Sequence, residues 1–153
     1  MRSDKSMSHA PDLVQALSSL PHGKEFRFID QLTSLVPGDS ASATWMLKGD
    51  EEFLHGHFPG HPLLPGVIMI EALAQLGGIL TQTRPGIPSM PGLRLTAVKQ
   101  FKILGSITPG ESLVIHARIE GALGNVVQVS GDIISASGLK LASGVVVLGS
   151  SGA

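Results

Sequence analysis

The clearest pattern in the chain is an apolar run at residues 67–80, which only Glu71 and Gln75 interrupt. A helix that is apolar on nearly every side is buried inside a fold rather than lying on its surface. Proline and glycine at residues 65–66 suit the start of such a helix, and Arg-Pro-Gly at residues 84–86 suits its end. The pattern therefore predicts one long central helix.

The rest of the chain shows the two-residue alternation of strands, divided by turn signals such as Pro-Gly and Gly-Asn. A short helix is expected at residues 11–20, where apolar positions recur at helical intervals. Strands are expected at residues 26–35, 41–47, 93–107, 113–120, 127–133 and 139–148. This order indicates an α+β fold with five or six antiparallel strands, in which one sheet wraps the helix because nothing else could cover it.

Composition narrows the class of protein. The 153 residues are 42% hydrophobic and 15% charged, which suits one domain over residues 11–153 behind a flexible tail at residues 1–10. A net charge of -1 does not indicate a nucleic-acid partner, and without cysteine there is neither a disulfide nor thiolate catalysis. The absence of cysteine fits the reducing cytoplasm, where we expect this protein, and the apolar run is too short to span a membrane comfortably and carries Glu71. The small charged fraction favours an oligomer.

Glu71 is the side chain with the most evident chemical use. A lone carboxyl on a buried apolar helix is costly unless it is paired, protonated or employed in a reaction. The loop before the helix, residues 53–66, is rich in glycine, proline and histidine, and its His57 is the natural partner. A histidine and a carboxyl group in different surroundings can serve as base and acid in one reaction. Gln75, one helical turn after Glu71, could hold the carboxyl in one orientation.

Gly66 adds a third element to this chemistry. It stands where the helix begins, so nearby backbone N–H groups lack helical partners, and without a side chain it lets a substrate carbonyl come close. A carbonyl polarised in this way loses its α-proton more readily to a base. An acid can then protonate a leaving hydroxyl on the β-carbon. Together these groups describe the β-elimination of water.

The loop and the helix combine uncommon residues at fixed offsets: His-Phe-Pro-Gly-His-Pro at 57–62, Pro-Gly-Val at 65–67, Glu-Ala at 71–72 and Ala-Gln at 74–75. This set resembles the signature of the (3R)-hydroxyacyl-acyl-carrier-protein dehydratases of bacterial fatty acid synthesis. Leu-Pro-His at residues 20–22 resembles the opening segment of that family. The resemblance implies a hotdog fold, in which an antiparallel sheet wraps one long central helix.

The resemblance also implies a role for each residue of the motif. His57 matches the catalytic base at the α-carbon of the substrate, and Glu71 matches the carboxyl that acts on the β-hydroxyl. Gly66 matches the glycine whose amide binds the thioester carbonyl, and Gln75 a residue that orients the carboxyl. Glutamate at position 71 points to the plain dehydratase, since a sister branch that also isomerises its product carries aspartate there.

Assembly and partners follow from the same resemblance. In this family the histidine and the carboxyl of one site come from different subunits, so we expect a homodimer, which could assemble further as a trimer of dimers. The expected partner is acyl carrier protein that carries the acyl substrate, and no metal or redox cofactor is needed. Val67 and Phe58 are further candidates for substrate contact.

Several alternatives stay open at this point. Hotdog folds host several activities, so a thioesterase or an enoyl-CoA hydratase is a second hypothesis, and a non-catalytic acyl-thioester-binding module is a third. Gln75 could be an ordinary polar residue of the helix and Phe58 a core residue, while His22 and His116 are interpreted as structural or surface residues. Two other possible sites are a metal site at His55, His57 and His61 and a basic patch for an acidic carrier protein at Arg94, Lys99 and Lys102.

Overall fold

The computed structural model describes residues 10–150, so the tail predicted at residues 1–10 lies outside the described residues except for its last position. In chain order the elements are α1 (Leu13–Leu17), the 3-10 helix η2 (Lys24–Phe26), β1 (Gln31–Val36), β2 (Ser40–Met46), the 3-10 helix η3 (Glu52–His55), α2 (Gly66–Gln82), β3 (Arg94–Ile103), β4 (Ser112–Leu123), β5 (Val126–Ser135) and β6 (Lys140–Gly149). The six strands form one sheet in the order β1-β2-β4-β5-β6-β3, and every neighbouring pair is antiparallel. The predicted α+β architecture is confirmed.

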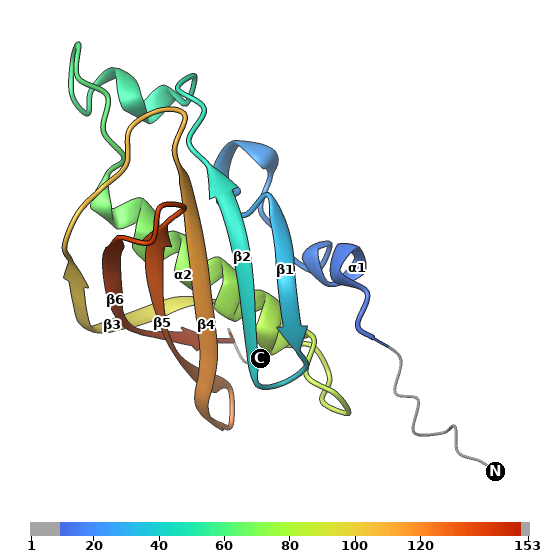
Figure 1. The fold of residues 1–153 in the computed structure, drawn as a ribbon. Helices are drawn as coiled ribbons and strands as arrows, with labels where there is room; N and C mark the ends of the chain where they lie inside the picture. Colours follow the sequence, from blue (N-terminus) through green and yellow to red (C-terminus); the bar gives the residue numbers. More distant parts are fainter. Residues whose placement is uncertain (1–9, 151–153) are drawn as a thin grey trace.

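The predicted central helix is α2, which spans 17 residues and packs against β2, β3, β4, β5 and β6 (Figure 1). Leu73 and Leu76 are fully buried between the helix and the sheet. At Gly77 an added Cβ would lie 3.1 Å from the Val129 side chain, so glycine allows the helix to approach the sheet closely. None of the helices within residues 10–150 is long and apolar enough to cross a membrane.

The first strand begins later than predicted. Residues 24–26 form η2, and β1 starts only at Gln31, whereas the pattern predicted extended chain from residue 26. Phe28 and Ile29 are nearly inaccessible, as the pattern suggested, but they lie in the core ahead of the strand. The backbone N–H of Phe28 donates to the side chain of Gln75 on α2 instead of to a neighbouring strand. A buried backbone group can be satisfied in either way, so burial alone did not locate the strand.

β3 is an edge strand that pairs with β6, and it ends at Ile103 instead of continuing to residue 107. The pairing shifts between Lys99 and Lys102, so β3 contains an irregularity of the kind that bends an edge strand. Beyond the strand, the Ile107 carbonyl accepts a hydrogen bond from the Leu64 N–H at 3.0 Å. The chain therefore leaves the sheet here to support the loop that leads into α2.

Candidate functional site

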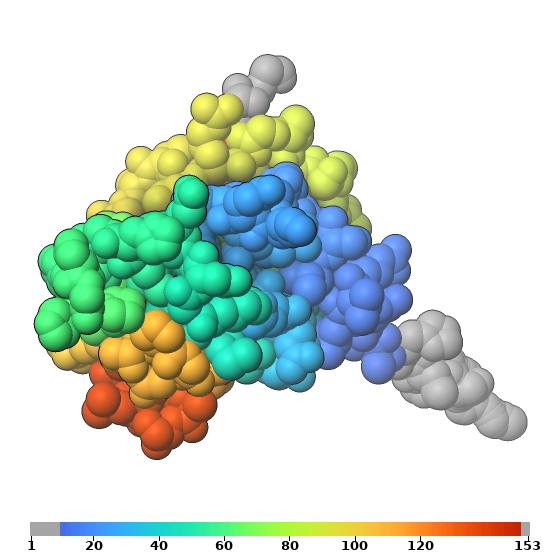
Figure 2. All heavy atoms as spheres, turned by 90° about the horizontal axis from the view of Figure 1, so that it is seen from above, coloured from blue at the N-terminus to red at the C-terminus, as the bar shows by residue number. Residues whose placement is uncertain are grey.

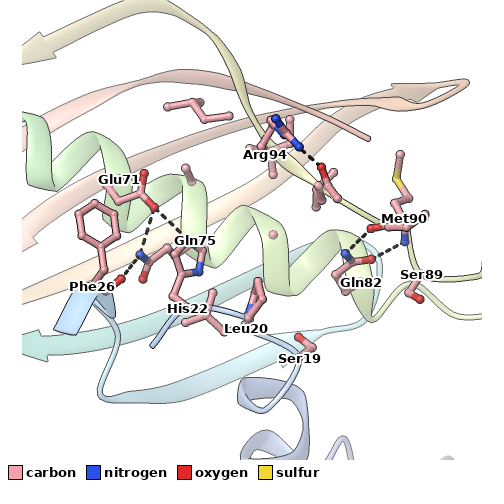
Figure 3. Close-up of a pocket in the computed structure, with 18 residues that line it drawn as sticks. Ser19, Leu20, His22, Phe26, Glu71, Gln75, Gln82, Ser89, Met90 and Arg94 are labelled. Carbon is pink, nitrogen blue, oxygen red and sulfur yellow. Dashed lines mark hydrogen bonds and ion pairs between the residues drawn. The ribbon is translucent and has the colours of Figure 1, made fainter. Parts of the chain in front are cut away.

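A groove of about 720 Å³ runs along one side of α2. Its other walls come from residues 19–26 and from residues 89–95, which lead into β3. Figure 3 shows Glu71 and His22 toward one end of the groove and Gln82 and Met90 toward the other. A mostly apolar groove with a few convergent polar groups is typical of a ligand-binding site. The apolar lining includes Leu20, Ala74, Leu93, Leu95 and Leu148.

Of the described residues, Glu71 alone brings a carboxyl group to this groove. Its side chain is 21% exposed, and its Oε2 accepts a hydrogen bond from Gln75 Nε2 at 3.1 Å. The same oxygen lies 3.3 Å from His22 Nε2. Within residues 10–150 no group donates to Oε1, so the carboxyl is held through one oxygen while the other is available to a ligand (Figure 3).

Gln75 joins the carboxyl to the segment that covers the helix. Its side chain is 1% exposed, and its Oε1 accepts from the Phe28 N–H at 2.8 Å. Its Nε2 donates both to the Phe26 carbonyl at 2.8 Å and to Glu71 Oε2. Both ends of the amide are therefore satisfied, and its orientation is determined by the backbone on either side of it. Gln75 is a structural clamp and also a partner of Glu71, so the two interpretations made from the sequence do not exclude each other.

His57 lies in the loop between η3 and α2. Its Nδ1 is 2.8 Å from the Leu63 carbonyl, and this loop is closed further by the Leu63 N–H donating to the His57 carbonyl at 2.9 Å. A carbonyl oxygen can only accept, so Nδ1 carries the proton of the neutral ring and Nε2 keeps a lone pair. The ring also stacks on Phe58, with centroids 4.1 Å apart. Nε2 is thus the ring nitrogen of His57 that can accept a proton.

The other predicted contact residues lie around the start of α2. Phe58 is 50% exposed and Val67 is 65% exposed, so the alternative that Phe58 belongs to the core is wrong. Gly66 opens the helix, and Pro65 before it offers no side-chain acceptor to the N–H groups of the first turn. A Cβ at Gly66 would lie 2.7 Å from the end of the Ile103 side chain, so glycine lets this side chain of β3 pack against the start of the helix without moving. The free N–H groups of a first helical turn suit a polarised oxygen.

The two residues predicted to share the chemistry do not meet within one chain. His57 makes no hydrogen bond or ion pair with Glu71 in the described residues, and it does not line the groove that contains the carboxyl. Figure 2 shows the loop before α2, in green, at one edge of the molecule. Glu71, Gln75 and the wall of residues 19–26 come together, while His57 stacks on Phe58 outside the lining of this groove.

Sequence reasoning missed one residue of the site. His22 was interpreted as structural or as a surface residue, yet it lies beside Glu71 in the groove. The signal that could have identified it was its place in the Leu-Pro-His segment, which resembled the family's opening segment. His116, by contrast, bonds with Ser42 Oγ at 2.7 Å on neighbouring strands of the sheet, away from the groove.

The alternative of a metal site at His55, His57 and His61 gains no support from the geometry. Among residues 10–150, no three histidine, aspartate or glutamate side chains converge as the ligands of a metal ion would. His57 turns its Nδ1 to a backbone carbonyl, and His61 contributes backbone hydrogen bonds that close the loop on Phe58. His57 and His61 shape this loop through these hydrogen bonds.

Comparison with known proteins identifies the family. The FabA-like domain matches residues 20–148 of the chain. The 3-hydroxyacyl-[acyl-carrier-protein] dehydratase FabZ of Nitratidesulfovibrio vulgaris is 38% identical over 109 residues, which cover 71% of this chain and 71% of that protein. The protein of the same name from Myxococcus xanthus is 31% identical over 134 residues, which cover 87% of each chain.

Solved structures show the same fold at lower identity. The dehydratase heterocomplex ApeI:P of Xenorhabdus doucetiae superimposes with a TM-score of 0.74 at 19% identity, covering 92% of this chain and 91% of that one. A mutant thioesterase of Pseudomonas aeruginosa superimposes with a TM-score of 0.69 at 15% identity, covering 93% of this chain and 95% of that one. The sheet wrapped around one long helix and these neighbours confirm the predicted hotdog fold. The chain belongs to the FabA-like family, in which its relatives at 31% to 38% identity are the FabZ dehydratases.

Proposed function

We propose that this protein is a hydro-lyase that converts (3R)-3-hydroxyacyl-acyl-carrier-protein to the trans-2-enoyl form in fatty acid biosynthesis. The family supports this reaction, since its FabZ relatives are 3-hydroxyacyl-[acyl-carrier-protein] dehydratases. The observation within the structure that carries it is the carboxyl of Glu71, held through Oε2 at one end of an apolar groove with Oε1 open. An acyl chain suits such a groove, and the carboxyl is then in place to act beside the thioester.

The proposed reaction divides the proton transfers between two groups. His57 Nε2 takes a proton from the α-carbon, and the electron pair of that C–H bond forms the double bond to the β-carbon. The bond between the β-carbon and the hydroxyl breaks as Glu71 Oε1 donates its proton, and the hydroxyl leaves as water. The Gly66 N–H at the start of α2 stabilises the charge that develops on the thioester oxygen. Gln75 keeps the acid oriented through its hydrogen bond to Oε2.

The site needs two copies of the chain. His57 and the groove of Glu71 lie apart in one chain, and the edge of β3 beside them is unpaired within the described residues. Large apolar side chains are exposed in this region, as expected for a surface that another copy covers. They are Phe58, Val67, Val98, Ile103 and Leu104. We therefore propose a homodimer in which His57 of one protomer faces Glu71 of its partner, with a trimer of dimers as a possible further assembly.

The proposed protein partner is acyl carrier protein. Arg94, at the start of β3, lines the groove, and Lys99 and Lys102 follow on the same strand. Lys99 donates to Gln128 Oε1 on β5 at 3.1 Å, so this cation is already oriented by a side chain beyond the intervening strand β6. Cations along a strand next to the groove suit an acidic carrier, because complementary charge speeds association and selects the partner.

Mutants of the two proposed catalytic residues test the function. His57→Ala and Glu71→Gln should each abolish hydration of crotonyl thioesters, the reverse reaction, while the thermal unfolding temperature stays near that of the parent. His55→Ala in the same loop is the matched control, because His55 ends η3 and is exposed, and it should keep full activity. Near-normal turnover by either catalytic variant, or release of free acid without enoyl product, would contradict the proposal.

Mixing the two inactive variants tests the shared site. A mixed dimer of His57→Ala and Glu71→Gln has one site in which both residues are intact, and random exchange makes half of the dimers mixed. The mixture should therefore recover about a quarter of the parent activity. No recovery after subunit exchange, verified by tagged protomers, would show that one chain supplies both residues.

A further inference from the structure

We propose that His22 is a positioning residue for Glu71, which holds carboxyl oxygen Oε2 together with Gln75 so that the proton exchanged with the substrate sits on Oε1. This inference rests on the proposed dehydration, since it takes Glu71 as the acid of that reaction. His22 acts through the carboxyl and does not touch the reacting atoms.

The surroundings of the His22 ring determine which nitrogen carries its proton. Nε2 lies 3.3 Å from Glu71 Oε2, whereas Nδ1 is buried and has no hydrogen-bond partner among the described residues. A proton on Nδ1 would be a buried donor without an acceptor, which is unfavourable. Nε2 therefore carries a proton, and this N–H faces Glu71 Oε2.

Two N–H groups then face the same oxygen of Glu71. Gln75 Nε2 donates to Oε2 at 3.1 Å, and His22 Nε2 points to that oxygen from the other wall of the groove (Figure 3). A protonated carboxyl places its proton on the oxygen that accepts fewer hydrogen bonds, because a donor facing another donor is repelled. The transferable proton is thus confined to Oε1, which no group in residues 10–150 contacts by a hydrogen bond and which belongs to a groove-lining residue.

The backbone segment that carries His22 is attached to α2 through the side-chain amide of Gln75. Arg27 Nη2 donates to the His22 carbonyl at 3.0 Å and to the Leu20 carbonyl at 3.3 Å, which closes the segment on itself. The His22 ring stacks on Phe26 with centroids 6.2 Å apart, and the Phe26 carbonyl accepts from Gln75 Nε2. His22 therefore has a fixed position relative to the carboxyl, as a residue that orients an acid must have.

Three variants at this position separate the Nε2 donor from the shape of the ring. His22→Phe keeps an aromatic ring without a donor, His22→Gln places an amide near the position of Nε2, and His22→Asn is too short to reach Glu71. We expect His22→Phe and His22→Asn to lower kcat for hydration of a crotonyl thioester by about tenfold to a hundredfold, the effect of one hydrogen bond to a charged group. KM should change less than about twofold, and His22→Gln should recover most of the lost kcat.

The controls separate a specific role of His22 from misfolding of a variant and from failure of the proposed function. His116→Phe, remote from the groove, should leave both constants unchanged, and urea unfolding of each variant shows whether it folds. Three results would overturn the role of His22. They are full activity of His22→Phe, equal losses of kcat in His22→Gln and His22→Asn, and a rise in KM at constant kcat. If His22→Phe does not fold, the comparison of Gln with Asn decides. A wild-type protein without hydratase activity would instead overturn the proposed function itself.

Discussion

Replacing Gln75 with leucine would remove the amide that connects α2 to the segment before β1, with little change in side-chain volume. The Phe28 N–H and the Phe26 carbonyl would lose their partners, and the first of these groups is fully buried. Two unsatisfied groups of this kind cost about 2–5 kcal/mol. Burial of the more apolar leucine returns about 1–2 kcal/mol, so a net loss centred on about 2 kcal/mol is expected.

Urea unfolding at a fixed protein concentration measures this loss. With a slope of about 2 kcal/mol per molar urea, the midpoint for Gln75→Leu should fall by about 0.5–1.5 M at unchanged slope. Gln31→Leu on the exposed face of β1 is the matched control and should stay within about 0.5 kcal/mol of the parent. A Gln75→Leu protein that unfolds at the parent's midpoint would refute the inference that this amide clamps the helix to the covering segment.

Two further predictions concern glycines. Gly131→Ala should lower the free energy of unfolding by about 3 kcal/mol or more, because its Cβ would collide with the His116 carbonyl on β4. Gly121→Ala is the control: its Cβ would lie in open space, so its free energy of unfolding in the same urea assay should stay within about 0.5 kcal/mol of the parent. A Cβ at Gly78 would meet only Leu93, at 4.0 Å, on the groove side of α2. Gly78→Val should therefore raise KM for long carrier-bound 3-hydroxyacyl substrates while short ones are still turned over, and equal effects on both would place the acyl chain elsewhere.

Patterns within one segment were sufficient to predict several features. The apolar run predicted α2 because a helix that buries all its faces needs no knowledge of its neighbours to be recognised. The four-residue spacing of Glu71 and Gln75 predicted that they share a face, and the hydrogen bond between them confirms it. The alternation along the C-terminal half likewise predicted its strands, since a half-buried strand has a period of two.

The start of β1 could not be predicted in the same way. Phe28 and Ile29 are as apolar as strand residues and as deeply buried, but the Phe28 N–H is satisfied across the fold rather than along a strand. The partner is a side chain 47 residues away on α2. Hydrophobicity reports where a side chain lies, while the extent of a strand depends on which backbone groups find partners.

The sequence by itself determined the central helix, the alternating strands and the one carboxyl that the helix carries, because each depends on residues close together in the chain. Only the tertiary structure decided which groups surround that carboxyl. His22 reaches Glu71 because Gln75 and Arg27 fix its segment against α2, and His57 stays apart from Glu71 because the loop and the groove lie in different places on one chain. Contacts between distant segments depend on the packing of the whole domain, which no local pattern encodes.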